Sequence, residues 1–252
     1  MKTKNIYGLI GYPLTHSFSS GYFAHKFTQE GIADCEYINF PIEDINNIKQ
    51  LIENNKQLVG FNVTIPYKEL IIPFLDKLSD EARDMGAVNT VKISREQEKT
   101  LLTGYNTDVY GFKKSLELYH VSIPPKALIL GTGGSSKAVS WVLKKLGCEP
   151  VYVSREPQNK DRNLSYEKLA DITLKDFPLI INTTPVGMYP NVKDHPQIPY
   201  SSATPSHTFF DLIYNPRETQ FLKKARHLGC KTINGLSMLE EQAEKAWDIW
   251  NG

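Results

Sequence analysis

The stretch Ala127-Leu128-Ile129-Leu130-Gly131-Thr132-Gly133-Gly134-Ser135-Ser136 decides the fold class of this chain. Its first four residues form a compact apolar run, which is typical of a buried strand. Glycines follow at once, and a helix is expected from about Ser136 to Leu146, where Gly147 is a suitable stop. A glycine-rich turn between a strand and a helix is the setting in which proteins bind the pyrophosphate of a dinucleotide. The segment therefore indicates an α/β unit with a candidate dinucleotide site.

The small residues of this turn have separate candidate roles. Gly131 would make the tight turn and Gly133 would let the backbone approach a pyrophosphate, while the helix start at Gly134 and Ser135 would supply N–H donors. The third fingerprint position falls on Ser136 rather than on glycine. A turn that connects strand and helix and binds no ligand is therefore the alternative.

The end of the next expected strand indicates which dinucleotide would bind. A site selective for NAD usually places Asp or Glu there, to hold the ribose 2′-hydroxyl. Here Val151-Tyr152-Val153 is followed by Ser154 and Arg155. A guanidinium and a hydroxyl can bind a 2′-phosphate through hydrogen bonds, which favours NADP. Without the glycine turn upstream, a solvated loop residue would be the better interpretation of Arg155.

Strands and helices alternate along the chain, which predicts an α/β fold with a parallel sheet covered by helices on both faces. Residues 88–93 and 101–104 are expected to form a hairpin, and a domain boundary is expected near residues 106–108. The other expected strands are 6–10, 37–40, 58–65, 127–130, 151–153, 179–181, 208–211 and 231–233. The expected helices are 19–31, 45–54, 70–78, 109–119, 136–146, 219–228 and 237–250.

Polar residues gather at the predicted strand ends of the first half, where open α/β sheets bind ligands. Ser17 and Ser19 are candidate donors for a carboxylate, although an N-cap is the plainer role for Ser19. Lys68 follows the strand that Pro66 stops, and Asp108 lies at a second loop end. A Lys and an Asp so placed can share a proton network. An ordinary surface ion pair of little energetic value is the alternative.

Composition excludes several classes of function. The chain has 252 residues, with 29 Lys and Arg against 28 Asp and Glu, and a formal net charge of +1. This balance gives no electrostatic footprint for nucleic acid or an anionic membrane. The three cysteines, Cys35, Cys148 and Cys230, are odd in number and far apart, which favours a reduced cytoplasmic compartment. Neither cysteines nor histidines have metal-binding spacing, so no metal is expected.

The ordered set of motifs resembles the shikimate dehydrogenase family over nearly the whole chain. The first block reads Gly-x-Pro-x-x-His-Ser-x-Ser and the second Asn-Val-Thr-x-Pro-x-Lys. Each block alone is weak, whereas their order along one chain is highly specific. The matching blocks are Gly11–Ser19, Asn62–Lys68, Gly86–Thr90, Gly104–Asp108, Gly131–Ser136, Asn182–Met188, Asp211–Pro216 and Gly235–Ala243.

The resemblance implies two domains and a reaction. Residues 1–106 with 235–252 would form an N-terminal α/β substrate domain, and residues 107–234 a Rossmann-like NADP-binding domain. The implied activity is the reversible NADPH-dependent reduction of 3-dehydroshikimate to shikimate, in aromatic amino-acid biosynthesis. The partner would be this small-molecule substrate, with no nucleic acid and no membrane, and the protein a monomer or a homodimer.

The resemblance also assigns roles to individual residues. Lys68 and Asp108 would form the catalytic pair and also touch the substrate. The implied substrate-binding set is completed by Ser17, Ser19, Thr64, Asn89, Tyr214 and Gln242. The implied cofactor-binding set is Gly131, Gly133, Gly134, Ser135, Ser154, Arg155, Thr183, Gly235 and Met238.

The chain departs from the family pattern at two places. Ser20 and the residues after it replace the usual Pro and later His-Asn, and Glu156 follows Arg155 where the family often has Thr. Glu156 would put a negative charge near a 2′-phosphate and weaken the preference for NADP. The alternatives are therefore a quinate/shikimate dehydrogenase using NAD, a binding protein without turnover, and a methylenetetrahydrofolate dehydrogenase-like enzyme.

Overall fold

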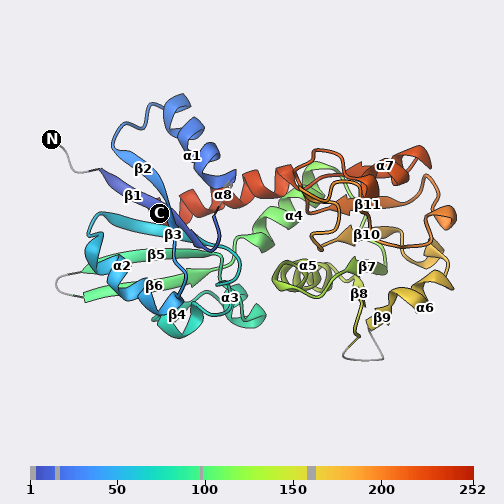
Figure 1. Ribbon diagram of the computed structural model, residues 1–252, viewed down its shortest axis with the longest axis horizontal. Coiled ribbons are helices and arrows are strands. Elements are labelled where there is room, and N and C mark those ends of the chain that lie inside the picture. Colours follow the sequence, from blue (N-terminus) through green and yellow to red (C-terminus); the bar gives the residue numbers. More distant parts are fainter. Residues whose placement is uncertain (1–3, 15–17, 97–98, 158–162) are drawn as a thin grey trace. The chain divides into compact units, whose positions relative to one another are not determined.

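The computed structural model describes residues 4–14, 18–96, 99–157 and 163–252. The chain divides into two compact units, Met1–Tyr110 with Glu240–Gly252, and Gly111–Leu239. Each unit is built on one sheet (Figure 1). The boundaries fall inside helices α4 (Asp108–Leu118) and α8 (Leu236–Asn251), a few residues beyond the loops where the sequence analysis placed them.

The first sheet is mixed, with the strand order β2-β1-β3-β5-β6-β4. Its parallel pairs are β1 with β2, β1 with β3, and β4 with β6. The predicted hairpin is present, since β5 and β6 pair antiparallel, and β3 also runs antiparallel to β5. The strands are β1 (Asn5–Gly11), β2 (Cys35–Pro41), β3 (Leu58–Val63), β4 (Lys77–Leu78), β5 (Thr90–Glu96) and β6 (Lys99–Tyr105).

Two hydrophobic clusters lie on opposite faces of the first sheet, because successive residues of a strand point to opposite sides. Tyr7 of β1 packs with Phe23, Trp247 and Trp250, which come from α1 (Phe18–Gln29) and α8. Ile10 of the same strand belongs to the other cluster, with Ile48 and Ile52 of α2 (Ile48–Asn54). Helices from the start and from the end of the chain therefore cover one face together.

The second sheet is entirely parallel, with the order β12-β11-β10-β7-β8-β9. Leu128 and Leu130 of β7 lie in a cluster with residues of α6 and α7, whereas Phe210 of β11 contacts Phe112 of α4 in a T-shaped arrangement. The elements are β7 (Lys126–Leu130), α5 (Gly134–Lys145), β8 (Glu149–Ser154), β9 (Asn163–Ser165), α6 (Tyr166–Ala170), β10 (Leu179–Asn182), β11 (Thr208–Asp211), α7 (Gln220–His227) and β12 (Lys231–Ile233). Parallel strands with helices on both faces confirm the predicted α/β class.

The helix predicted at 70–78 is wrong. The segment forms a short 3-10 turn, Ile72–Phe74, and then the edge strand β4. Pro73 disfavours helical geometry in the residue before it. Asp76 then pairs with β6, because its N–H donates to the Leu102 carbonyl at 2.9 Å and its carboxylate accepts from Leu102 N–H at 2.8 Å. Pairing with a neighbouring strand thus overrides an apolar pattern that suits a helix. The short helix α3 (Asp80–Met85), which was not predicted, follows with Ser79 as its N-cap.

None of the helices in the described part of the chain combines the length and apolar character that a membrane crossing requires. Within the same residues, no three His, Cys, Asp or Glu side chains come together as ligands for a metal ion.

Candidate active site and dinucleotide-binding site

Lys68 and Asp108 form an ion pair in the first unit, with 2.6 Å between Nζ and Oδ2. The two residues are placed by different elements. Lys68 lies in the turn after β3, and its carbonyl accepts from Val88 N–H at 2.7 Å. Asp108 is the first residue of α4, where a negative charge is favourable at the positive end of the helix dipole. The Asp108 side chain is only 4% exposed, so the pair is not the solvated surface contact that was the alternative.

Asn89 holds the carboxylate from its other side. Its Nδ2 donates to Asp108 Oδ1 at 2.9 Å, while its own Oδ1 accepts from the N–H of Thr107 at 2.7 Å. The N–H of Asp108 donates to Asn106 Oδ1 at 3.0 Å. Both carboxylate oxygens and the backbone of Asp108 are thereby fixed. The side chain of Lys68, whose ammonium binds one of these oxygens, is 19% exposed. A charged donor in such a place can stabilise and protonate an oxygen that becomes negative during a reaction.

The hydrogen-bond network continues from Asn89 toward α1. Thr90 Oγ1 donates to Asn89 Oδ1 at 3.2 Å, Asn62 Nδ2 donates to Thr90 Oγ1 at 3.1 Å, and Tyr37 donates to Asn62 Oδ1 at 2.8 Å. Ser19 hydrogen-bonds to Tyr37, whose pKa is raised by burial. Ser19 thus lies at one end of a chain of contacts that leads to Asp108. Ser17, its predicted companion, lies outside the described residues.

Several members of this network were not predicted from the sequence. Thr90, Asn106 and Thr107 lie inside quoted motifs but received no role, and their polar type beside buried strands was the available signal. Tyr37 gave no signal, because a tyrosine in a strand usually serves packing.

The remaining predicted substrate residues divide between the two units. Thr64 follows β3 directly, with its N–H donating to the Ile10 carbonyl at 2.9 Å. Gln242 lies on the part of α8 that belongs to the first unit. Tyr214 belongs to the second unit, where it follows β11 and burial raises the pKa of its phenol.

The glycine turn of the second unit has the backbone expected of a dinucleotide site. Gly131 has φ +105°, which favours glycine, and a Cβ there would lie 2.8 Å from Thr184 Cγ2. Gly133 is the N-cap of α5 and makes no side-chain cap, and Gly134 and Ser135 open the helix. Thr183, a predicted cofactor-binding residue, lies beside this turn. Both its N–H and its hydroxyl donate to the Leu130 carbonyl, at 2.9 and 2.7 Å.

A pocket of about 240 Å³ lies next to the glycine turn. It is lined by residues of the turn, of α5, of β8 and β9 and of the segment after β8: Thr132, Ser136, Lys137, Tyr152, Glu156 and Asn163. Ser154, at the end of β8, has a buried Oγ without a hydrogen-bond partner among the described residues. Arg155 is exposed. Burial raises the pKa of Tyr166, and the positive charge of Arg155 is close enough to oppose this rise in part. A buried hydroxyl without a partner and a neighbouring guanidinium fit a phosphorylated ribose. Glu156 introduces a carboxylate to the same pocket.

Gly235 and Met238 lie in the second unit at the start of α8. Gly235 donates its N–H to the Ile213 carbonyl at 3.1 Å, and a Cβ at this position would overlap the Leu212 carbonyl. Met238 is only 3% exposed. The structure thus gives Gly235 a packing reason to be glycine, which is independent of any cofactor contact.

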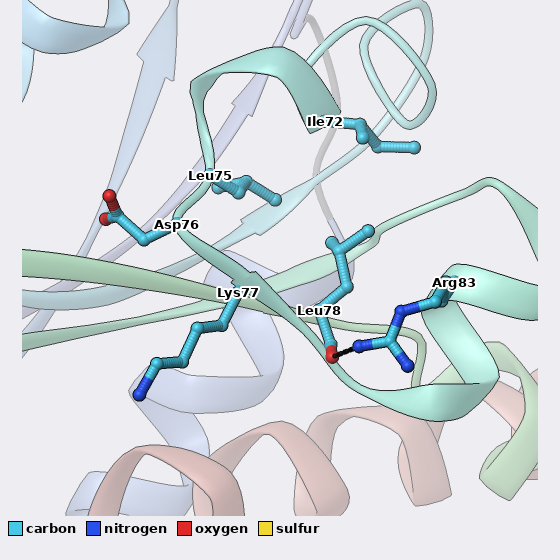
Figure 2. Close-up of a pocket in the computed structure, with 6 residues that line it drawn as sticks. All are labelled: Ile72, Leu75, Asp76, Lys77, Leu78 and Arg83. Carbon is cyan, nitrogen blue, oxygen red and sulfur yellow. Dashed lines mark hydrogen bonds between the residues drawn. The ribbon is translucent and has the colours of Figure 1, made fainter.

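A second pocket, of about 460 Å³, lies in the first unit at β4 and α3 (Figure 2). Ile72, Leu75 and Leu78 form its apolar lining. Lys77 and Arg83 are the cations in its lining. The guanidinium of Arg83 donates to the Leu78 carbonyl at 3.1 Å and to Asp80 at 2.8 Å. None of its lining residues belongs to the predicted sites, so we assign no chemistry to it.

Comparisons with known proteins agree with this arrangement. A family model described as "Shikimate dehydrogenase substrate binding domain" matches residues 9–91. A relative named shikimate dehydrogenase (NADP(+)), from Methanococcus maripaludis, is 42% identical, with 100% of this chain and 92% of the relative covered. The crystal structure of shikimate 5-dehydrogenase from Thermus thermophilus, in complex with NADP(H) and shikimate, has a TM-score of 0.85 at 30% identity, covering 98% of this chain and 93% of the other. The enzyme from Listeria monocytogenes, in complex with shikimate and NAD, has a TM-score of 0.85 at 28% identity, with 98% and 92% covered.

Proposed function

Because the chain belongs to the shikimate dehydrogenase family, we propose that it catalyses the reversible NADPH-dependent reduction of 3-dehydroshikimate to shikimate. This is a step of the shikimate pathway toward aromatic amino acids. The single observation that carries the proposal is the buried pair of Lys68 and Asp108, 2.6 Å apart and held by Asn89. A protein that only binds a ligand does not require an ammonium and a carboxylate so arranged.

The proposed chemistry follows from the charges of the pair. When bound, the nicotinamide supplies the hydride that reaches the carbonyl carbon. Lys68 stabilises the negative charge that develops on the carbonyl oxygen, and its ammonium delivers a proton to that oxygen. The resulting amine recovers a proton from solvent. Asp108 orients Lys68 and accepts a hydrogen bond from the substrate.

In this proposal, uncharged hydroxyl and amide side chains bind the substrate and hold it in position. Ser17 and Ser19 bind the carboxylate of the substrate, with Tyr214 assisting, and Thr64, Asn89 and Gln242 hold its hydroxyl groups. Such contacts fix the reacting carbon and convert an encounter between two molecules into a reaction within one complex. In Asn89 one Nδ2 proton is directed at Asp108, so the second proton is the one offered to a hydroxyl.

The proposed cofactor site joins the glycine turn to the end of β8. Gly131, Gly133, Gly134 and Ser135 hold the pyrophosphate at the start of α5, and Ser154 and Arg155 hold the 2′-phosphate of NADP. The buried hydroxyl of Ser154, which lacks a partner among the described residues, supports this assignment. Thr183, Gly235 and Met238 complete the proposed set on the nicotinamide side.

We further propose the assignment of whole segments and the setting of the reaction. Residues 1–106 with 235–252 form the substrate-binding domain and residues 107–234 the NADP-binding domain, although Tyr214 also contributes to the substrate site and Gly235 and Met238 to the cofactor site. The protein is cytoplasmic and is a monomer or a homodimer. The three free cysteines support a reducing compartment. Sedimentation analysis of the purified protein distinguishes the two assembly states.

The decisive experiment follows the absorbance of reduced nicotinamide with purified protein, shikimate and NADP, and repeats it with NAD and with quinate. Turnover with shikimate and NADP supports the proposal. Turnover mainly with NAD or quinate would move the function to the quinate/shikimate dehydrogenase, which Glu156 in the pocket favours. Binding of shikimate without turnover in any combination would favour a binding protein, and absence of both would contradict the proposal.

A further inference from the structure

Asp211 is a buried carboxylate in the second unit that the proposed chemistry does not use. It ends β11 and has 0% exposure. Its Oδ1 accepts from Asn182 Nδ2 at 3.0 Å and from the N–H of Ile213 at 3.1 Å, and its Oδ2 accepts from the hydroxyl of Thr219 at 2.5 Å. One side chain therefore connects the carboxyl ends of two neighbouring strands and the start of α7. Burial raises the pKa of Asp211 to about 7, so the charged form of this side chain is held in place at an energetic cost.

Asn182 transmits this contact to the turn that follows β10. Its Oδ1 accepts from the N–H of Thr184 at 3.0 Å and from the hydroxyl of Thr184 at 2.6 Å. The hydroxyl of Thr184 in turn accepts from the N–H of Val186 at 3.3 Å. The amide of Asn182 has a terminal oxygen and a terminal nitrogen with opposite hydrogen-bonding roles. The nitrogen donates to Asp211 Oδ1 at 3.0 Å and, at the longer distance of 3.5 Å, to the carbonyl of Val186, while the oxygen faces Thr184.

The same turn packs against the glycine turn. Thr183 donates twice to the carbonyl of Leu130, the residue before Gly131. A Cβ on Gly131 would lie 2.8 Å from Thr184 Cγ2 and 2.9 Å from Thr183 Oγ1. The two turns are therefore in close contact, and a shift of residues 183–186 would displace the backbone around Gly131.

We propose that Asp211 is a positioning residue for NADP binding, which acts through Asn182 to fix the turn at residues 183–186 against the glycine turn. The inference rests on the proposed function only in the identity of the cofactor. Asp211 reaches Thr184 of this turn through Asn182, so its effect on the cofactor is indirect. Removal of its acceptors leaves only the 3.5 Å contact to the Val186 carbonyl to hold the amide nitrogen of Asn182, so the partner of Thr184 is less firmly fixed.

The test compares three variants by equilibrium binding. Asp211→Val removes both acceptors while keeping the volume similar. Asp211→Asn can direct its amide nitrogen at Thr219 and keep an oxygen for Asn182 and Ile213, so it is the conservative rescue. Thr219→Val is the matched control, since it removes a hydrogen bond to Oδ2 of the same carboxylate and leaves Oδ1, the oxygen that accepts from Asn182, in place. NADPH affinity is measured by its fluorescence, and shikimate affinity by calorimetry.

We expect Asp211→Val to weaken NADPH binding by about tenfold or more, the effect of losing one or two buried hydrogen bonds that fix a binding turn. Shikimate affinity should stay unchanged. Thr219→Val should lower the melting temperature. Both Thr219→Val and Asp211→Asn should leave NADPH affinity within about threefold of the wild type. Hydrogen exchange at the amides of Thr184 and Val186 should become faster in Asp211→Val only.

Wild-type NADPH affinity in Asp211→Val, or equal losses of NADPH and shikimate binding, would overturn the inference. If Asp211→Val does not fold, Asp211→Ser, which keeps one short hydroxyl, is held to the same expectation. If the wild-type protein binds NADPH but shows no turnover of shikimate, the proposed reaction fails while the comparison of variants still decides the role of Asp211.

Discussion

At the scale of single residues, the site depends on charges that are buried in pairs. Removal of one member of a buried ion pair leaves the other without compensation, which is more damaging than loss of a surface contact. Lys68 and Asp108 form such a pair beside the network of Asn89. Lys26 and Glu244 form a more exposed ion pair in the same unit, at 2.8 Å, with 9% side-chain exposure of the lysine and 41% of the glutamate, and this pair lies outside the predicted site.

Lys68→Ala is expected to reduce kcat by about 10³-fold or more, because it removes the group that we propose as the proton donor and as the charge opposite the developing oxyanion. Shikimate should still bind, as measured by calorimetry. Lys26→Ala is the control: it should lower the melting temperature and leave kcat within about twofold, since its partner serves only stability. Retained turnover in Lys68→Ala would remove the lysine from the mechanism.

Glu156→Gln is expected to strengthen NADP binding by about three- to tenfold relative to NAD, because it removes a carboxylate from the pocket proposed to hold the 2′-phosphate. The fragments 2′,5′-ADP (adenosine 2′,5′-bisphosphate) and 5′-AMP, which differ only in the 2′-phosphate, are titrated by calorimetry and isolate this effect from catalysis. Glu149→Gln, at the opposite end of β8, provides the control with the same change of charge. Equal affinity changes for both fragments would show that Glu156 does not sense the 2′-position.

At the scale of elements, the backbone conformation of the glycine turn demands glycine at Gly131. Gly131→Ala is expected to destabilise the protein by about 2–4 kcal/mol, because φ is +105° and the new Cβ would meet Thr184 and Thr183. Gly147→Ala separates the two causes, since Gly147 also has a positive φ, +81°, but a Cβ there meets no atom within 4 Å. Its cost should be about 1 kcal/mol. Denaturant titration measures both, and equal losses would contradict the steric part of the argument.

Elements were predictable where local pattern and tertiary pairing agree. The run before Gly131 is apolar, ends in glycines and pairs on both sides as a central parallel strand. Residues 70–78 have an apolar pattern as well, but their structure is decided by Pro73 and by the pairing of Asp76 with Leu102. That partner is distant in the sequence, so no local pattern could indicate it.

The candidate site was predictable in part for the same reason. Lys68 and Asp108 were identified by type and by position at strand ends, and the structure brings them together. Their mutual distance required the whole sheet. Tyr37 and the bridging role of Asn62 stayed hidden, because a hydrogen bond between two strands depends on their register, which only the assembled sheet defines.

At the scale of the whole molecule, stability is expected to depend on pH through Asp211. Its pKa is raised from 3.8 to about 7 in the folded protein, so the unfolded chain loses this proton first. The folded state then holds more protons between about pH 4 and 7, and the free energy of unfolding falls as the pH rises through that window. Asp211→Asn should remove this pH dependence. The free energy of unfolding that the wild type loses across the window is on the order of a few kcal/mol. Denaturant titrations at pH 4.5, 6 and 7.5 give the comparison, and an unchanged slope in the variant would assign the effect to other groups.

The first unit is completed by residues that are far apart in the sequence. Tyr7 near the start of β1 packs on Trp247 and Trp250 of α8, and the whole second unit is inserted between them. During synthesis on the ribosome, Tyr7, Phe23 and Phe27 therefore emerge long before the tryptophans that cover them. At about 5–20 residues per second, the interval is roughly 10–50 s. A nascent chain of this protein presents an aromatic face to chaperones throughout that time, while its inserted unit can already fold.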